Sequence, residues 1–90
     1  MAVISNPDML EARSPEAIGK VVRFHRKRAG LSQRALADLA GIGKTSVFDI
    51  EKGKSTVRLA TLLAVFDALN LKLNLAGPLM SEFGHAGSRT

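Results

Sequence analysis

The chain has no cysteine among its 90 residues, so neither a disulfide framework nor a metal site built from thiolates is available to it. It also has no tryptophan or tyrosine and only four phenylalanines, too few for an aromatic platform that stacks single-stranded nucleic acid. Its longest apolar run, Leu62 to Phe66, is too short for a membrane span or a secretory signal. The length allows one small domain with short arms.

Positive charge is concentrated in the middle of the chain. The net charge is +5, but residues 20–58 contain ten lysines and arginines against three acidic residues, whereas residues 1–19 and 59–90 contribute no positive surplus. This concentration of positive charge either belongs to an ordinary solvated surface or attracts a polyanion, which is nucleic acid or an anionic membrane. A helix on a membrane surface needs aromatic anchors beside its basic residues, and only Phe24 and Phe48 come close, so nucleic acid is favoured.

Residues 14–68 carry the start and stop signals of four helices. Serine caps the free N–H groups at a helix start, and glycine after a basic last turn is typical of a helix end. The expected helices run from Ser14 to the residue before Gly30, from Ser32 to about Ala40, from near Gly43 to Lys52, and onward from a cap at Thr56. The apolar stripes expected to form the core are Ile18, Val22, His25 and Ala29; Leu36, Leu39 and Ala40; Val47 and Ile50; and Leu59, Leu62, Leu63, Phe66 and Leu69.

The residues after the fourth helix change period. From Leu69 to Leu75 apolar and polar residues alternate strictly, which is the period of a strand. Nothing else in the chain has a strand pattern, and a lone strand cannot satisfy its own backbone groups, so its mate is expected from a second copy. Leu69, Leu71, Leu73 and Leu75 would then cover the last helices of both copies. The alternative is a helix that continues through Lys72 with no sheet.

These signals divide the chain into four parts. An N-terminal arm without a clear period occupies 1–13, the helical domain 14–68, the dimerisation strand 69–76, and a flexible tail rich in glycine and serine 77–90. The positive surplus of the chain therefore lies on the helical domain and not on either arm.

The second and third helices are joined by a linker, Ala40-Gly41-Ile42-Gly43, that is short enough for a helix-turn-helix. At about 100° per residue, Val47 and Ile50 share the side of the third helix that faces the core. The opposite side carries a short, mostly polar set that fits the major groove, where base edges are distinguishable. The candidate base contacts are Lys44, Thr45, Phe48 and Asp49. The alternative is an ordinary amphipathic surface helix.

Each of these side chains has a chemistry that can read a base edge. Lys44 can donate to guanine, and Thr45 can donate or accept. Phe48 can touch a thymine methyl group, and Asp49, although repelled by phosphate, can accept from the cytosine amino group. The candidate phosphate contacts lie at helix starts or in the loop after the third helix: Gln33, Ser46, Lys52, Lys54 and Arg58, with Arg28 and Arg34 as weaker candidates.

Residues 18–58, and above all the stretch from Leu31 to Lys54, resemble the Cro/C1-type (XRE) helix-turn-helix family, which includes phage repressors. The resemblance implies an all-α, lambda-repressor-like domain of four to five helices, here with a C-terminal β-strand paired across a homodimer. It implies that Gln33 contacts a phosphate and that Arg26 and Glu51 form a buried structural pair. Gly43 stands where the family usually has a serine or threonine cap, so a backbone N–H would replace one phosphate contact there.

The segment from Thr56 to Leu63, followed by 69–75, resembles HipB-type antitoxins. That resemblance implies repression of the chain's own operon in the bacterial cytoplasm, and binding to a HipA-type kinase toxin. Two copies would place their third helices about 34 Å apart on a palindromic double-stranded operator. The alternatives are a stand-alone phage-type or chromosomal repressor with no toxin partner, and a kinase antidote whose DNA contact is secondary.

Several other signals fail. Gly43-Lys44-Thr45 has part of a phosphate-binding loop, but Asp38 stands where the pattern needs its first glycine, and no strand precedes it. His25 and His85 are better explained as a core-edge residue and a tail residue than as metal ligands. No catalytic set stands out, so the sequence predicts neither an enzyme nor a cofactor or metal site.

Overall fold

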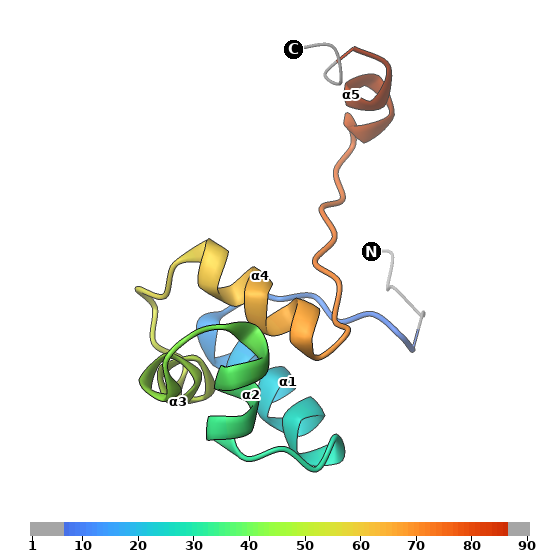
Figure 1. Cartoon of the computed structure of the whole chain (residues 1–90). Coiled ribbons are helices and arrows are strands. Elements are labelled where there is room, and N and C mark those ends of the chain that lie inside the picture. The colour runs from blue at the N-terminus through green and yellow to red at the C-terminus, as the bar shows by residue number, and fades with distance from the viewer. Residues whose placement is uncertain (1–6, 87–90) are drawn as a thin grey trace.

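The computed structural model describes residues 7–86, and within that range it contains five helices and no strand. In chain order the helices are α1 (Pro15–Arg28), α2 (Gln33–Ala40), α3 (Lys44–Lys52), α4 (Leu59–Ala68) and α5 (Met80–Ala86). Figure 1 shows α1 to α4 packed into one bundle, while α5 stands clear of it at the end of an extended segment. None of the described helices is long and apolar enough to cross a membrane.

The predicted starts of α1 and α2 and the predicted end of α2 are confirmed, and each depends on a local sequence signal. The Ser14 hydroxyl accepts from the Ala17 N–H at 3.1 Å, and the Ser32 hydroxyl accepts from the Ala35 N–H at 3.0 Å. Gly41, with φ of +73°, ends α2 in the left-handed conformation that glycine adopts without strain. These local signals place α1 and α2 within a residue of the prediction.

The predicted cap of the fourth helix is wrong. Helix α4 begins at Leu59 with Arg58 as its cap residue and no side-chain cap hydrogen bond, so Thr56 does not start it. Ser55 and Thr56 form a turn instead. Val57, which comes next, packs against the core. The chain therefore packs Val57 against the core before α4 begins at Leu59.

The core lies where α1 to α4 meet, and its buried apolar residues are Val22, Leu36, Ala37, Val47, Ile50, Val65 and Phe66. The expected stripes contain most of this set but also include errors. Leu39, Leu59 and Leu63 are 64%, 58% and 40% exposed, and Ala29 is exposed as well, so none of these four belongs to the core. Ala37 and Val65 are buried in their place, because the angle at which each helix meets its neighbours decides which edge of the stripe is covered.

Helix α1 packs against the end of α3 at very short range. A Cβ atom on Gly19 would collide with the carbonyl oxygens of Ile50 and Glu51. Glycine is therefore required here by the backbone of α3, not by its own φ angle. This contact brings the middle of α1 next to Glu51, which matters for the site described below.

The chain leaves the bundle at a turn formed by Leu69 and Asn70, and Asn70 has a positive φ of 58°. The alternative in which the fourth helix continues through Lys72 is therefore wrong. The strand expected over 69–76 is not formed in this single chain: residues 71–77 run extended, without a ladder partner among the described residues. Leu69 and Leu71 pack against the core, whereas Leu75 is 79% exposed.

The segment expected to be a loose tail contains α5. Leu79 and Phe83, one turn apart, are linked by a backbone hydrogen bond of 3.0 Å and are 66% and 61% exposed. The sequence signal for this helix is weak because α5 has only seven residues and includes Gly84. The rest of the expected arm and tail, residues 1–6 and 87–90, lies outside the residues that the structure describes.

Candidate nucleic-acid interface

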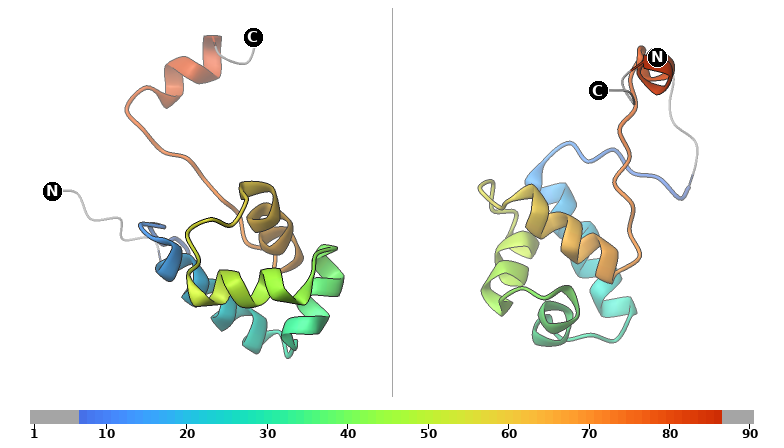
Figure 2. Two further views of the ribbon diagram at one scale, coloured as in Figure 1. Left: turned by 90° about the vertical axis from the view of Figure 1, so that its left-hand side faces the viewer. Right: turned by 45° about the horizontal axis from the view of Figure 1, so that its top comes forward.

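The inner side of helix α3 is fixed in the core of the bundle. Val47 and Ile50 are 0% and 2% exposed, so both are held in the core. In the turn that precedes α3, the Ile42 N–H donates to the Ala37 carbonyl oxygen at 3.0 Å, and the Ile42 side chain packs against the core. Figure 2 shows the resulting arrangement, with α3 lying along the surface of the bundle. The helix therefore cannot rotate to hide its outer side.

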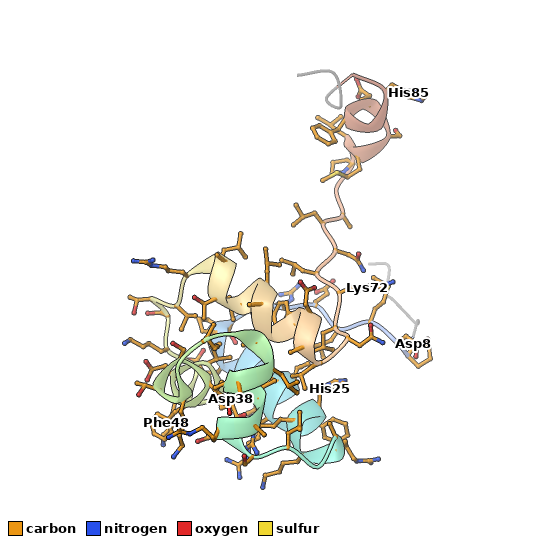
Figure 3. All side chains as sticks on the ribbon, in the orientation of Figure 1. Asp8, His25, Asp38, Phe48, Lys72 and His85 are labelled. Atoms are coloured by element: carbon orange, nitrogen blue, oxygen red, sulfur yellow. The ribbon has the colours of Figure 1, made fainter. Side chains whose placement is uncertain are left out.

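The outer side of α3 carries the residues expected to read bases. Lys44 and Thr45 are exposed, Phe48 is 46% exposed and Asp49 is half-buried. Figure 3 shows Phe48 pointing away from the bundle. A hollow of about 160 Å³ lies beside them, lined by Gln33, Lys44, Thr45 and Phe48. The fold thus brings the first residue of α2 next to three of the four candidate base contacts.

Gln33 is held in place by a buried ion pair. The Arg26 guanidinium donates to both Glu51 carboxylate oxygens, at 2.5 and 2.9 Å, and to the Leu31 carbonyl oxygen at 2.8 Å. The Gln33 amide donates to the same carboxylate at 3.1 Å. The Arg26 and Glu51 side chains are only 10% and 3% exposed. Because this network joins α1, α2 and α3, it sets how α2 begins relative to α3.

The Gln33 amide nitrogen carries two hydrogens, and Glu51 uses one of them. The second makes no hydrogen bond within the described part of the chain. Gln33 is therefore a donor whose direction is set before any ligand arrives, which lowers the entropy lost on binding.

The charge state of Glu51 is set by the same contacts. Burial alone would raise the pKa of Glu51, but hydrogen bonds from Arg26 and Gln33 and the charges of Arg26 and Arg23 outweigh it and lower that pKa below 4.5. The hydrogen bond to Glu51 raises the pKa of Arg26 above its ordinary value, against the opposing effect of burial. Both groups are therefore charged at neutral pH.

Two lysines, Lys52 at the end of α3 and Lys54 just after it, contact residues on the outer side of that helix. The Lys52 ammonium lies 5.6 Å from the centre of the Phe48 ring, and the Lys54 ammonium lies 3.4 Å from an Asp49 carboxylate oxygen. Among the remaining candidate phosphate contacts, Ser46 is half-buried, whereas Arg34 and Arg58 are exposed. Lys52 and Lys54 are thus the two candidate phosphate contacts that touch residues on the outer side of α3 within the described chain.

Arg28 lies on a different surface. It stacks on Phe24 at 5.0 Å, and its place in α1, two residues after the inward-facing Arg26, turns it about 200° away from the buried pair. Arg23 is the residue that the sequence analysis missed. It is exposed, makes no ion pair within residues 7–86, and lies close enough to Glu51 to lower its pKa. The available signal was its position one turn before Arg26.

The chain is similar in sequence to known regulators. The helix-turn-helix family model (HTH_3) matches residues 22–75. The uncharacterized HTH-type transcriptional regulator y4mF of Sinorhizobium fredii is 35% identical over 66 residues, which cover 73% of this chain and 87% of that protein. The competence pilus inhibition repressor of Acinetobacter baylyi is 31% identical over 71 residues, which cover 79% of this chain and 64% of that protein.

The chain is also similar in fold to solved structures that contain HipB. Chains in a HipA-HipB-O2-O3 complex and in a HipB-O4 20mer complex align with a TM-score of 0.70, covering 78% of this chain and 99% of those chains. The sequence identity is 21% in both, so this similarity concerns the fold alone.

The buried pair predicts a specific dependence of stability on pH. Because folding lowers the pKa of Glu51, its contribution to stability is present above about pH 4.5 and is lost as the pH falls through its pKa in the folded state. Glu51→Gln leaves Arg26 buried without its counter-ion and should cost about 3 kcal/mol at pH 7. Urea unfolding from pH 7 down to about pH 3 measures both effects.

In the Glu51→Gln variant the loss of stability on acidification should be smaller than in the wild type. Glu82→Gln, on exposed α5, is the matched control and should unfold like the wild type. If the Glu51→Gln protein is as stable as the wild type at pH 7, the Arg26–Glu51 pair does not stabilise the fold.

Proposed function

The chain belongs to the helix-turn-helix family, and we propose that it is a transcriptional repressor that binds double-stranded DNA with the outer side of α3. The observation that carries this proposal is the division of α3 into two sides. Val47 and Ile50 hold one side in the core, so the other side is presented to solvent in a fixed orientation. A helix of nine residues held in this way fits the major groove.

Sequence recognition is assigned to the exposed side of α3. Lys44 donates to guanine, Thr45 donates or accepts, Phe48 contacts a thymine methyl group, and Asp49 accepts from a base amino group. The first three line the hollow beside Gln33. A polar side chain next to an apolar one is the combination that distinguishes base pairs by both hydrogen bonds and methyl contacts.

Affinity is assigned to the basic residues around that side. The proposed phosphate contacts are Gln33, Ser46, Lys52, Lys54 and Arg58, with Arg23 added from the structure and Arg34 and Arg28 as weaker contributors. Contacts of this kind position the helix and carry no sequence information. The positive surplus in residues 20–58 supports them, because neutralising phosphates releases counter-ions from DNA.

The repressor is proposed to act as a homodimer. Only Thr61 and Asp67 are polar in α4, and a helix that is apolar on all sides is normally covered on all sides, yet Leu59 and Leu63 are 58% and 40% exposed. The backbone of 72–76 makes no hydrogen bond within the described part of the chain. A second copy would satisfy both needs.

In that dimer the extended segments pair as strands. The leucines that alternate along the segment, Leu69, Leu71, Leu73 and Leu75, would cover α4 of both copies. A two-fold axis between the strands requires a palindromic operator, with the two α3 helices about 34 Å apart.

The finer proposal is a HipB-like antitoxin that represses its own operon and binds a HipA-type kinase toxin. The likeness in fold to chains of HipB complexes and the match over 99% of their length support it. A stand-alone repressor is the second candidate, favoured by the higher sequence identity to y4mF and to the competence pilus inhibition repressor.

The two candidates differ in what accompanies the protein. When the tagged chain is purified from its native cells, an antitoxin should carry a kinase with it in a fixed ratio, identified by mass spectrometry. A stand-alone repressor should come alone while still protecting its own promoter in a footprint. A preparation without a kinase overturns the antitoxin proposal and leaves DNA binding in place.

The base contacts can be separated from the phosphate contacts. Lys44→Ala should weaken binding to a duplex selected from a random pool by about 1–3 kcal/mol more than binding to a scrambled duplex. Arg58→Ala should lower affinity for both duplexes alike and reduce the slope of log K against log salt by about 1. Equal losses on both duplexes for Lys44→Ala would remove that residue from base readout.

The proposed pairing of the two extended segments predicts that one charged substitution on their apolar side separates the dimer. Leu73→Asp places a carboxylate on the apolar side of the strand and should give monomers in analytical ultracentrifugation, because burying an unpaired charge is costly. Lys72→Asp, on the opposite side by alternation, is the control and should leave the dimer intact. A Leu73→Asp protein that sediments as a dimer refutes this interface.

A further inference from the structure

Asp49 is an acidic residue among the basic groups of the DNA-facing side, and Lys54 partners it. The Asp49 side chain is 27% exposed, and the Lys54 ammonium lies 3.4 Å from its carboxylate. The pairing is built into the end of α3. Gly53, with φ of +81°, turns the chain back, and the Lys54 N–H donates to the Asp49 carbonyl oxygen at 3.0 Å.

A carboxylate in this position restricts the bases that it can face. In the major groove guanine offers only acceptors at N7 and O6, and thymine offers an acceptor and a methyl group. Only cytosine and adenine present an amino group, which can donate to Asp49. A carboxylate enclosed without a donor costs more free energy than a missing contact, because the desolvated charge stays unpaired.

Lys54 is also one of the proposed phosphate contacts, and its ammonium cannot stay at Asp49 and bind a phosphate at full strength together. A complex in which Lys54 leaves Asp49 is more stable where another donor satisfies the carboxylate that the DNA encloses. The availability of Lys54 to the DNA backbone is therefore tied to the base that Asp49 faces.

Resting on the proposed DNA-binding function, we propose that Lys54 is a conditional phosphate contact. It stays on Asp49 in the free protein and on non-specific DNA. It moves to a phosphate only where a cytosine or adenine amino group takes over the Asp49 carboxylate. The pair thereby gives one additional backbone contact where Asp49 faces cytosine or adenine, and withholds that contact where it faces guanine or thymine.

This mechanism has a signature in the salt dependence of binding. Each phosphate contact contributes about 0.9 to the slope of log K against log salt. The specific complex should therefore contain one contact from Lys54 that the non-specific complex lacks. One such contact makes affinity fall about 3.5-fold further between about 50 and about 200 mM salt.

The experiment compares four full-length proteins on two duplexes. The proteins are the wild type, Asp49→Ala, Lys54→Ala and Asp38→Ala. The last variant removes an exposed carboxylate from α2, so it matches Asp49→Ala in net charge (Asp38 is labelled in Figure 3). One duplex is selected from a random pool with the wild type, and the other is scrambled. Fluorescence anisotropy at several salt concentrations gives each slope, and thermal unfolding confirms that each variant is folded.

Lys54→Ala should reduce the slope by about 0.9 on the selected duplex and leave the slope on the scrambled duplex unchanged. Asp49→Ala frees Lys54 everywhere, so it should steepen the slope on the scrambled duplex by about 0.9, whereas Asp38→Ala should not. In repeat selections the wild type should require cytosine or adenine at one fixed position of each half-site, and Asp49→Ala should lose that requirement.

Equal loss of slope on both duplexes for Lys54→Ala overturns the proposal, because Lys54 would then be an unconditional contact. So does an Asp49→Ala protein whose slope on the scrambled duplex is no steeper than that of Asp38→Ala. In both cases the wild type still selects a sequence and the proposed function stands. A wild type that selects no duplex overturns the proposed function and this inference with it.

Discussion

The hydrogen-bonded ion pair between Arg26 and Glu51 is the contact on which the rest of the site depends. It joins α1 to the end of α3, and through Gln33 it reaches the start of α2. Removing two charges from water is costly, and the cost is met here because the guanidinium and the carboxylate each have several partners. An apolar contact of the same volume would hold the helices together, but it would not accept the hydrogen bond that fixes the Gln33 amide.

A second constraint acts on the orientation of α3. With its inner side fixed by Val47 and Ile50, α3 presents the other side to solvent permanently, and Lys52 and Lys54 contact residues of that side. The free protein thus keeps cations close to where a DNA backbone would pass. Asp49 and Phe48 on this side matter for binding as much as the basic residues do, because they determine where the Lys54 and Lys52 ammonium groups lie in the free protein.

The parts of the fold that were predictable are those set by local chemistry. The serine caps of α1 and α2 and the left-handed glycine at the end of α2 act within a few residues, so the sequence specifies them directly. The exposure of Leu39, the late start of α4 and the hydrogen bond from Gln33 to Glu51 depend on how helices meet. The strand predicted over 69–76 is not formed in the single chain, where the backbone of 72–76 has no hydrogen-bond partner among the described residues.

The central claim is that the outer side of α3 meets a DNA duplex. The most direct test is an NMR titration of the isotopically labelled protein with a duplex selected from a random pool. The account predicts that the amide signals of 44–49, Gln33 and the loop through Arg58 shift together, while those of α5 do not. Shifts gathered on the outer side of α4, with the signals of α3 unchanged, would contradict it.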